Sequence, residues 1–163
     1  MKQRIGIIAI LLLAFGGMAD AAYLAQHELI GTPLICNIES LSDCNTVASS
    51  SYSHLFGIPL AIYGVIFYAV LFTLAALELL IFDRLLRRVI QIIALLGVVA
   101  EIGFTFIQVY LINALCMYCL ASAAIAFFIL VFASLIEPVR RDMFDRPEPP
   151  LFPPAPHLRM PPA

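Results

Sequence analysis

The chain has 163 residues, of which 63% are hydrophobic and 12% are charged, with a formal net charge of -2. This length suits one domain, but the composition excludes an ordinary soluble globular protein and indicates a membrane protein. The small net charge gives no indication that nucleic acid is a partner.

Four apolar segments are each long enough to cross the hydrocarbon core of a bilayer, which takes about 20 helical residues. The connections between the last three are short, so their helices must be antiparallel neighbours. Residues 1–136 are therefore predicted to form an all-α membrane domain, a bundle of four transmembrane helices. The predicted spans are residues 5–24, 58–82, 89–112 and 115–136.

The first apolar segment has a second interpretation. Its basic start, its apolar run and the motif Ala19-Asp20-Ala21 also fit a cleavable secretory signal, whose removal would leave three spans. We favour a retained span because apolar residues resume at Tyr23 and Leu24. In addition, a topology with four spans places every basic residue on the cytoplasmic side. Asp20, near the outer end of this span, is then expected to be a solvated interfacial residue.

Basic residues give the orientation, because cytoplasmic loops near membrane ends retain Lys and Arg. The segment 25–57 and the turn at Asn113 contain neither, so both are expected to face away from the cytoplasm. All four cysteines then fall on that side, where thiols can be kept oxidised. The nine basic residues are Lys2 and Arg4 before the first span, Arg84, Arg87 and Arg88 between the second and third, and Arg140, Arg141, Arg146 and Arg159 after the fourth.

The outer segment contains a pattern of apolar residues among serines. Val47, Leu55 and Phe56 lie in residues 44–56, which predicts a short helix or turn on the membrane surface that caps the bundle. Pro59 is expected in the first turn of the second span, where its missing N–H has no helical partner. His54 is expected to be an ordinary surface or interface residue.

Glu101 lies near the middle of the third span, where a charge costs at least about 2.5 kcal/mol. It must therefore face the bundle, be protonated or be paired. Two roles stay open, a structural hydrogen bond to a neighbouring helix and the handling of protons. Gln108 lies further along on a similar face and is a candidate polar companion.

Cys116 and Cys119 stand at the start of the fourth span. Residues three apart in a helix lie on neighbouring faces, and the N–H groups of a helix N-terminus favour a thiolate. A lowered pKa would suit disulfide exchange. The alternatives are a pair of buried structural cysteines and half a zinc site, but no Cys/His spacing supports zinc, and no metal is expected.

Cys36 and Cys44 form a second pair on the same side of the membrane, in the outer segment. Four cysteines allow three pairings, and the sequence alone leaves them open. A soluble dithiol can reach a pair on a loop, and a pair at a helix mouth can reach a lipid-soluble acceptor, so we hypothesise a relay for two electrons. The most economical acceptor in a membrane is a quinone.

The motifs in chain order are Cys36, Cys44 with Asn45-Thr46-Val47-Ala48-Ser49-Ser50, Tyr52-Ser53, Gly57-Ile58-Pro59-Leu60, Gly64 and Cys116-Met117-Tyr118-Cys119. Their order and placement on four spans resemble the vitamin K epoxide reductase family, in particular its bacterial members that reoxidise periplasmic thiol oxidants. The resemblance covers residues 5–136. It implies a four-helix bundle around a quinone, covered by a periplasmic loop that carries a short surface helix.

The resemblance also implies a role for each cysteine. Cys119 would lie against the quinone and transfer the electrons, Cys116 would exchange with Cys44, and Cys36 would complete the loop disulfide. Ser50 matches a family position in the quinone site, although it could instead cap the surface helix. The implied acceptor is ubiquinone or menaquinone, and the implied partner is a separate DsbA-like protein with a thioredoxin fold. The implied location is the bacterial cytoplasmic (inner) membrane, with the cysteines periplasmic and both termini cytoplasmic.

Two rival functions remain in view. One is a vitamin K epoxide or quinone reductase that uses the same relay, although Ala123 stands where the vertebrate enzymes carry a tyrosine. The other is a non-enzymatic membrane scaffold whose cysteines staple the outer segment to the bundle. Residues 137–163 are rich in proline and are predicted to form a disordered cytoplasmic tail without chemistry.

Overall fold

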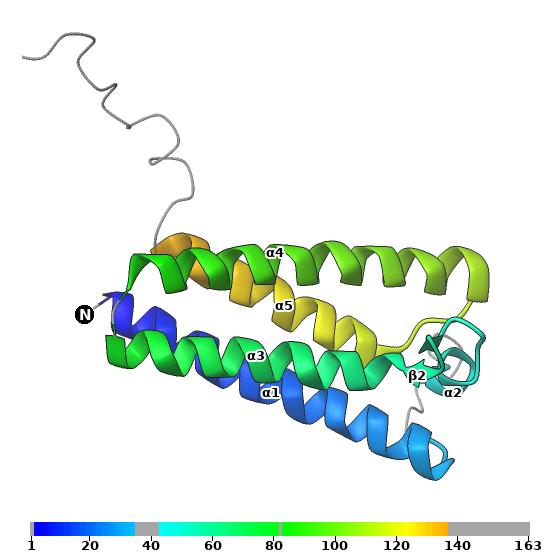
Figure 1. Ribbon diagram of the computed structural model, residues 1–163. Helices are drawn as coiled ribbons and strands as arrows, with labels where there is room; N and C mark the ends of the chain where they lie inside the picture. Colours follow the sequence, from blue (N-terminus) through cyan, green and yellow to red (C-terminus); the bar gives the residue numbers. More distant parts are fainter. Residues whose placement is uncertain (1, 35–42, 82, 137–163) are drawn as a thin grey trace, which may run out of the picture.

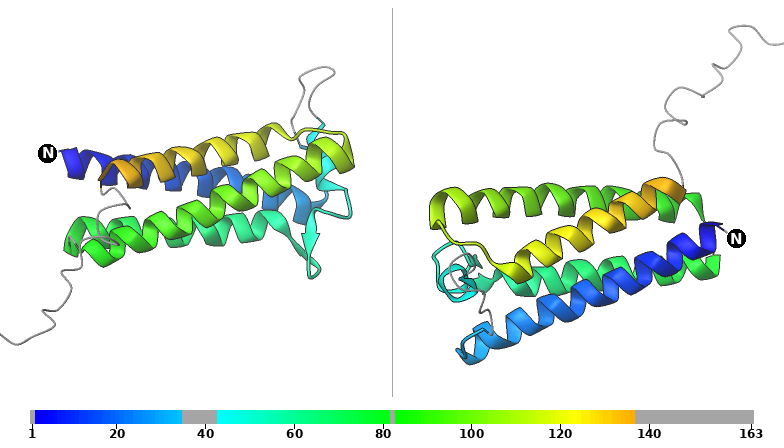
Figure 2. Two further views of the ribbon diagram at one scale, coloured as in Figure 1. Left: turned by 90° about the horizontal axis from the view of Figure 1, so that it is seen from above. Right: turned by 180° about the vertical axis from the view of Figure 1, so that it is seen from behind.

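The computed structural model describes residues 2–34, 43–81 and 83–136. Within these ranges four helices are long and apolar enough to cross a membrane, and they lie side by side as a bundle (Figures 1 and 2). This confirms the predicted four-helix membrane bundle. The helices are α1 (Lys2–Ile30), α3 (Leu60–Ile81), α4 (Arg84–Ile107), which continues into the π-helix η1 (Gln108–Ile112), and α5 (Met117–Ile136).

Short elements gather at one end of the bundle, opposite the N-terminal end of α1 (Figure 1). They are the helix α2 (Cys44–Ala48) and an antiparallel pair of two-residue strands, β1 (His54–Leu55) and β2 (Ile58–Pro59). We call residues 43–59 the lid. The lid confirms the predicted surface helix above the bundle, but the small hairpin that follows α2 was not predicted.

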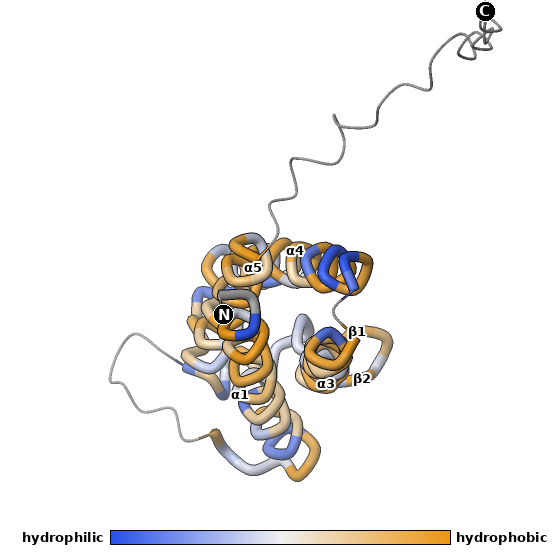
Figure 3. The backbone as a smooth tube through the Cα atoms, turned by 90° about the vertical axis from the view of Figure 1, so that its left-hand side faces the viewer, coloured by the Kyte–Doolittle hydropathy of each residue, from blue (hydrophilic) through white to orange (hydrophobic). Residues whose placement is uncertain are grey.

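The core of the bundle consists mostly of small and branched apolar residues from all four long helices, together with the ring of Tyr68. Outside this core the helices expose large apolar side chains, as expected for surfaces that face lipid. Most of the tube in Figure 3 is accordingly coloured as hydrophobic. The buried core residues are Ile10, Ala14, Ala21, Tyr68, Leu71, Ala75, Ile90, Ala94, Ile129 and Ala133.

The observed spans differ at their ends from the predicted ones. Helix α1 continues past Leu24 to Ile30 and stops at Gly31, whose φ of 70° is the left-handed conformation that commonly ends helices. Helix α4 begins at Arg84 rather than Val89, because the Asp83 side chain accepts a hydrogen bond from the N–H of Leu85 and caps the helix.

Pro59 is not in the first turn of the second span. It pairs with His54 in the hairpin, and α3 starts only at Leu60. A residue before proline avoids the helical conformation, which explains why Ile58 is extended. The proposed boundary between a membrane domain and a tail at residue 136 is untested, because residues 137–163 lie outside the described part of the chain.

Candidate functional site

A cavity of about 350 Å³ lies beneath the lid and between the helices. Its wall is mostly apolar, with contributions from the lid and from α1, α3, α4 and α5. This size and character are typical of sites for small organic ligands. The polar and thiol side chains that line the cavity include Asp20, Glu28, Cys44, Ser50, Tyr68, Glu101, Gln108, Cys116, Cys119 and Ser122.

Three of the four predicted catalytic cysteines line this one cavity. Cys44 and Cys116 are buried in the same apolar cluster, and Cys119 packs against that cluster. Cys44 is disulfide-bonded, whereas Cys116 and Cys119 are free thiols. Cys36 lies outside the described residues. The lid cysteine and the helix-mouth pair are therefore gathered in one place, although they are far apart in sequence.

A backbone contact sets the position of Cys44 relative to Cys116. The N–H of Asp43 donates a hydrogen bond of 3.1 Å to the carbonyl of Leu115, so the residues just before the two cysteines are joined. Asp43 also caps α2 by accepting from the N–H of Thr46. Hydrogen bonds from Thr46 keep the pKa of the Asp43 carboxyl below its usual range. The carboxylate is thus available as a cap at ordinary pH.

Gln108 holds the other side of the CxxC motif. Its buried side-chain oxygen accepts a 2.9 Å hydrogen bond from the N–H of Cys116, and its amide also bonds the sulfur of Cys119. Gln108 begins the π-helix η1, a local irregularity that is often found at functional sites. Asn113, at a φ of 55°, then reverses the chain toward Cys116. Gln108 therefore contacts the cysteines and not Glu101, the companion considered from sequence.

The surroundings of Cys116 favour its thiolate. Helix α5 starts at Met117, so Cys116 stands directly before the helix and Cys119 lies in its first turn. A hydrogen bond from the thiol of Cys119 lowers the pKa of Cys116, and backbone N–H groups of Cys119 and Tyr118 act in the same direction, while burial opposes them. Cys116 is thus the better nucleophile of the pair for disulfide exchange.

The deep end of the cavity contains a hydrogen-bonded chain of three side chains. Ser122 Oγ donates to Glu101 Oε1 over 2.8 Å, and the hydroxyl of Tyr68 lies 2.9 Å from Ser122 Oγ and 2.9 Å from the Ser122 carbonyl oxygen. These bonds link α3, α4 and α5. Of the two roles open for Glu101, the structure shows the hydrogen bond to a neighbouring helix.

Asp20 is not simply a solvated interfacial residue. Its side chain lines the cavity, and its Oδ2 atom is buried without a hydrogen-bond partner. The helical phase of α1 explains this orientation, because Asp20 lies next to Ala21, which packs against Gly64 of α3. Sequence reasoning expected a solvated Asp20 near the outer end of the span and did not predict that its side chain lines the cavity.

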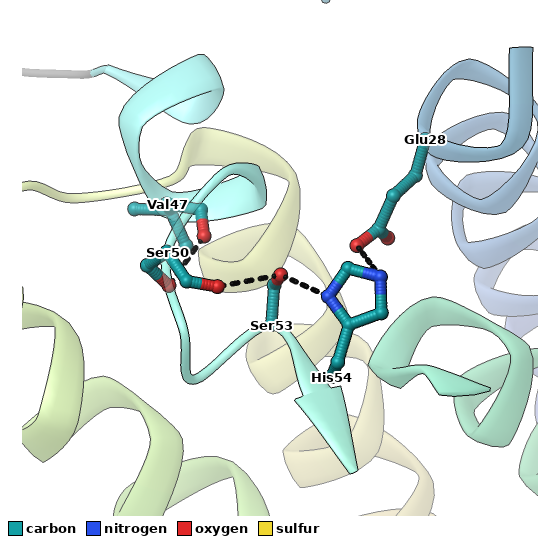
Figure 4. Close-up of polar contacts among 5 residues, drawn as sticks. All are labelled: Glu28, Val47, Ser50, Ser53 and His54. Atoms are coloured by element: carbon teal, nitrogen blue, oxygen red, sulfur yellow. Dashed lines mark hydrogen bonds and ion pairs between the residues drawn. The ribbon is translucent and has the colours of Figure 1, made fainter. Parts of the chain in front are cut away.

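The lid is fastened to α1 by polar contacts (Figure 4). Nε2 of His54 lies 3.7 Å from Oε1 of Glu28, and Nδ1 of His54 lies 2.9 Å from the hydroxyl of Ser53. Ser53 donates to the carbonyl of Ser50 over 2.9 Å, and Ser50 donates to the carbonyl of Val47 over 2.7 Å. His54 is thus part of a latch between the lid and α1. Ser50 both ends the turn after α2 and lines the cavity.

Comparison with known proteins identifies a single family. A sequence model described as the Vitamin K epoxide reductase family matches residues 8–134, which is most of the chain. No curated protein matches the chain. The matched residues include α3, α4, η1, the lid, all four cysteines and most of α1 and α5.

Proposed function

The chain belongs to the vitamin K epoxide reductase family and is a membrane thiol–disulfide oxidoreductase, and from this premise we propose its reaction. It generates disulfides in a DsbA-like partner with a thioredoxin fold and passes the electrons to a membrane quinone. Cys36, Cys44, Cys116 and Cys119 carry the electrons, and Cys119 and Ser50 contribute to the quinone site.

One observation carries this proposal. A disulfide-bonded cysteine of the lid and two free cysteines at a helix mouth line the same apolar cavity. Cysteines that only form structural disulfides would not need to include free thiols. A soluble thiol enzyme would not need an apolar cavity between membrane helices. The combination suits a protein that takes electrons from a thiol and gives them to an apolar acceptor.

The order of the thiol steps follows from position and nucleophilicity. A thiolate of the partner attacks the Cys36–Cys44 disulfide of the lid, which lies at the end of the bundle. Cys44 then exchanges with Cys116, whose buried side chain packs in the same cluster. The disulfide attacked in this step is Cys116–Cys119, from which Cys119 leaves. Cys36 then attacks Cys44 and displaces Cys116, a step that the lowered pKa of Cys116 favours. The exchange frees the Cys119 sulfur inside the cavity.

The residues of the cavity fit a quinone headgroup. A quinone is a flat apolar ring with two hydrogen-bond acceptors, and it accepts two electrons when it is bound. Cys119 lines the cavity beside the hydroxyls of Tyr68 and Ser122, and Asp20 contributes a buried oxygen without a partner. Ser50 would first have to release the carbonyl of Val47 before it could donate to such a ligand. Tyr68 and Ser122 were not singled out from the sequence.

The proposed location is the bacterial cytoplasmic membrane with the lid in the periplasm. The lid and the described cysteines occupy one end of the bundle, while Arg4, Arg84 and Arg87 belong to the other end (Figure 1). This separation supports an orientation with the arginines on the cytoplasmic side. A periplasmic lid would meet oxidising partners in their own compartment.

The test is a coupled assay with purified protein. Reduced DsbA-like partner and quinone are mixed with the protein, and quinone absorbance is followed while free thiols are counted. We expect one quinone reduced for each disulfide formed in the partner. The Cys119→Ala variant should lose at least about 10³-fold in rate, because no sulfur faces the acceptor.

Two outcomes would contradict the proposal. A Cys116→Ala, Cys119→Ala double variant that reduces quinone at the wild-type rate would exclude these residues from the reaction. Wild-type protein that reduces a quinone epoxide but oxidises no protein thiol to a disulfide with quinone would assign the reductase function instead. Supplying both acceptors side by side makes this distinction.

A further inference from the structure

Four polar side chains meet at the deep end of the cavity, one from each long helix. They are Asp20 of α1, Tyr68 of α3, Glu101 of α4 and Ser122 of α5. Ser122 lies three residues after Cys119, so the two side chains are neighbours on one face of α5. The polar group is therefore next to the sulfur from which electrons leave.

The chain of hydrogen bonds is continuous from the carboxyl of Glu101 to the hydroxyl of Tyr68. Ser122 Oγ is the middle member, 2.8 Å from Glu101 Oε1 and 2.9 Å from the Tyr68 hydroxyl. The ring of Tyr68 is held in place because Gly17 of α1 leaves room for it. A Cβ atom at Gly17 would stand 2.5 Å from that ring.

This group has more hydrogen-bonding capacity than packing requires. A structural link between helices would be complete with Glu101 and Ser122, yet Oδ2 of Asp20 is buried beside the same cavity without a partner. A carboxyl at this depth of a membrane is costly as an anion, which favours its protonated form. The bond from Ser122 Oγ to Glu101 Oε1 suits the carboxylate. In the protonated form the Glu101 hydroxyl donates to Ser122 Oγ instead, and the hydroxyls of Ser122 and Tyr68, either of which can be the donor in their own bond, can pass a proton toward the cavity.

We propose that Glu101 donates a proton to the acceptor reduced at Cys119, through the hydroxyls of Ser122 and Tyr68. This inference rests on the proposed function, in which that acceptor is a quinone. Asp20 is a second carboxyl that faces the same acceptor. The proposal gives a catalytic role to residues that the thiol relay leaves unused.

The proton and electron balance shows why such a donor is needed. Before reduction of the acceptor, Cys116 is a thiolate and Cys119 is a thiol. Formation of the disulfide between them breaks the S–H bond of Cys119 and releases two electrons to the quinone, whose two oxygens take up two protons. Cys119 supplies one proton and Glu101 supplies the other, which leaves Glu101 as a carboxylate. In the next cycle the oxidation of a partner thiol releases a proton. This proton returns to Glu101, because Cys116 stays a thiolate and does not take it up.

The kinetic test compares Glu101→Gln with wild type in the coupled assay. Glutamine preserves the shape and the hydrogen bond to Ser122 but cannot release a proton. We expect kcat for quinone reduction to fall about 10²-fold, with KM for quinone unchanged and with the same rate of exchange between partner thiols and the lid. Ser122→Ala, which interrupts the chain, should also lower kcat. The control is Thr73→Val on α3, an exposed residue whose hydroxyl bonds the carbonyl of Ala69 and which does not line the cavity.

The spectroscopic test needs no quinone. Infrared spectra of the reduced protein should contain the C=O band of a protonated carboxyl that disappears in Glu101→Gln and shifts in D2O. In Ser122→Ala the same band should move, which keeps the proposal testable if Glu101→Gln does not fold. A Glu101 that is ionised in the reduced protein, or whose proton does not exchange, would overturn the proposal.

Failure of this inference can be told from failure of the proposed function. If wild-type protein does not transfer electrons from thiols to quinone, the proposed function is wrong. If wild type and Glu101→Gln reduce quinone equally fast while Cys119→Ala does not, only the proton donor is wrong.

Discussion

The two ends of the bundle use their buried polar side chains in different ways. At the end without the lid, Nε of Arg87 lies 2.9 Å from Oε1 of Glu78, and Gln91 donates to the carbonyl of Ala133 over 2.8 Å. These groups satisfy one another and join α3 to α4 and α4 to α5. At the lid end, polar groups line a cavity, and Asp20 keeps an oxygen without a partner. One end of the bundle therefore holds the helices together, while the other keeps space and hydrogen-bonding capacity for chemistry.

The largest expected effect on stability belongs to the end without the lid. Glu78→Ala removes the partner of a largely buried arginine and the acceptor of the Asp83 N–H. Breaking a buried ion pair in this way should lower the free energy of unfolding by about 3–5 kcal/mol. Denaturation of the detergent-solubilised protein measures the loss. Quinone reduction per folded molecule should stay near wild type. A loss of activity without a loss of stability would contradict the claim that this end of the bundle serves stability alone.

A smaller effect is expected where the two ends meet, at a pair of adjacent glycines. Gly17→Ala forces a Cβ atom against the ring of Tyr68, whereas a Cβ atom at Gly16 meets nothing within 4 Å. The first change should cost about 1–3 kcal/mol by overpacking and should slow quinone reduction by displacing Tyr68 from Ser122. The second should be neutral or slightly stabilising, because alanine favours helix more than glycine does. Equal effects of the two variants in thermal unfolding and in the coupled assay would contradict the packing around Tyr68.

The lid end should also show an unusual thiol. Because the hydrogen bond from Cys119 lowers the pKa of Cys116, its thiolate should persist below the pKa of an ordinary cysteine, about 8.5. Alkylation of Cys116 in the reduced protein by a small reagent, followed by mass spectrometry, should continue at lower pH than for a free thiol. In Cys119→Ala the same profile should move to higher pH. Identical profiles in the two proteins would rule out this interaction.

The smallest expected effect concerns the latch between lid and α1. Glu28→Gln weakens a contact to His54, whose side chain is 46% exposed, so the cost in stability should be only about 0.2–1 kcal/mol. Hydrogen exchange of lid amides should become faster, while α4 should exchange as in wild type. Unchanged exchange in the lid would mean that other contacts, such as the bond between Asp43 and Leu115, hold it alone.

The sequence predicted the four helices, the short surface helix and the family, because long apolar runs and cysteine spacing are strong local signals. It also placed Cys44, Cys116 and Cys119 at one end of the bundle. That the four cysteines and Ser50 act as predicted stays a proposal, and Cys36 lies outside the described residues. The hairpin at 54–59 was missed, although the pair Phe56-Gly57, both at positive φ, forms its turn.

The cavity itself could not be predicted, because it depends on how the helices are rotated relative to one another. A helix that is apolar on all sides carries little periodic information about its inner face. Asp20, Tyr68 and Ser122 therefore gave no sign of their common orientation. Gln108 was considered only as a candidate companion of Glu101, and its bond to Cys116 was not predicted. The π-helix at Gln108 is also absent from any simple sequence pattern, since it adjusts the phase of α4 just before Cys116.

Whether the two cysteine pairs form a relay can be tested by trapping the exchange between the lid and the start of α5. Cys119→Ala protein is treated with reduced partner, free thiols are blocked, and disulfides are mapped by mass spectrometry. We expect a Cys44–Cys116 disulfide, because Cys119 is no longer present to compete for Cys116. If Cys44 forms no disulfide with Cys116 under any ratio of partner to protein, the two cysteine pairs do not form a relay.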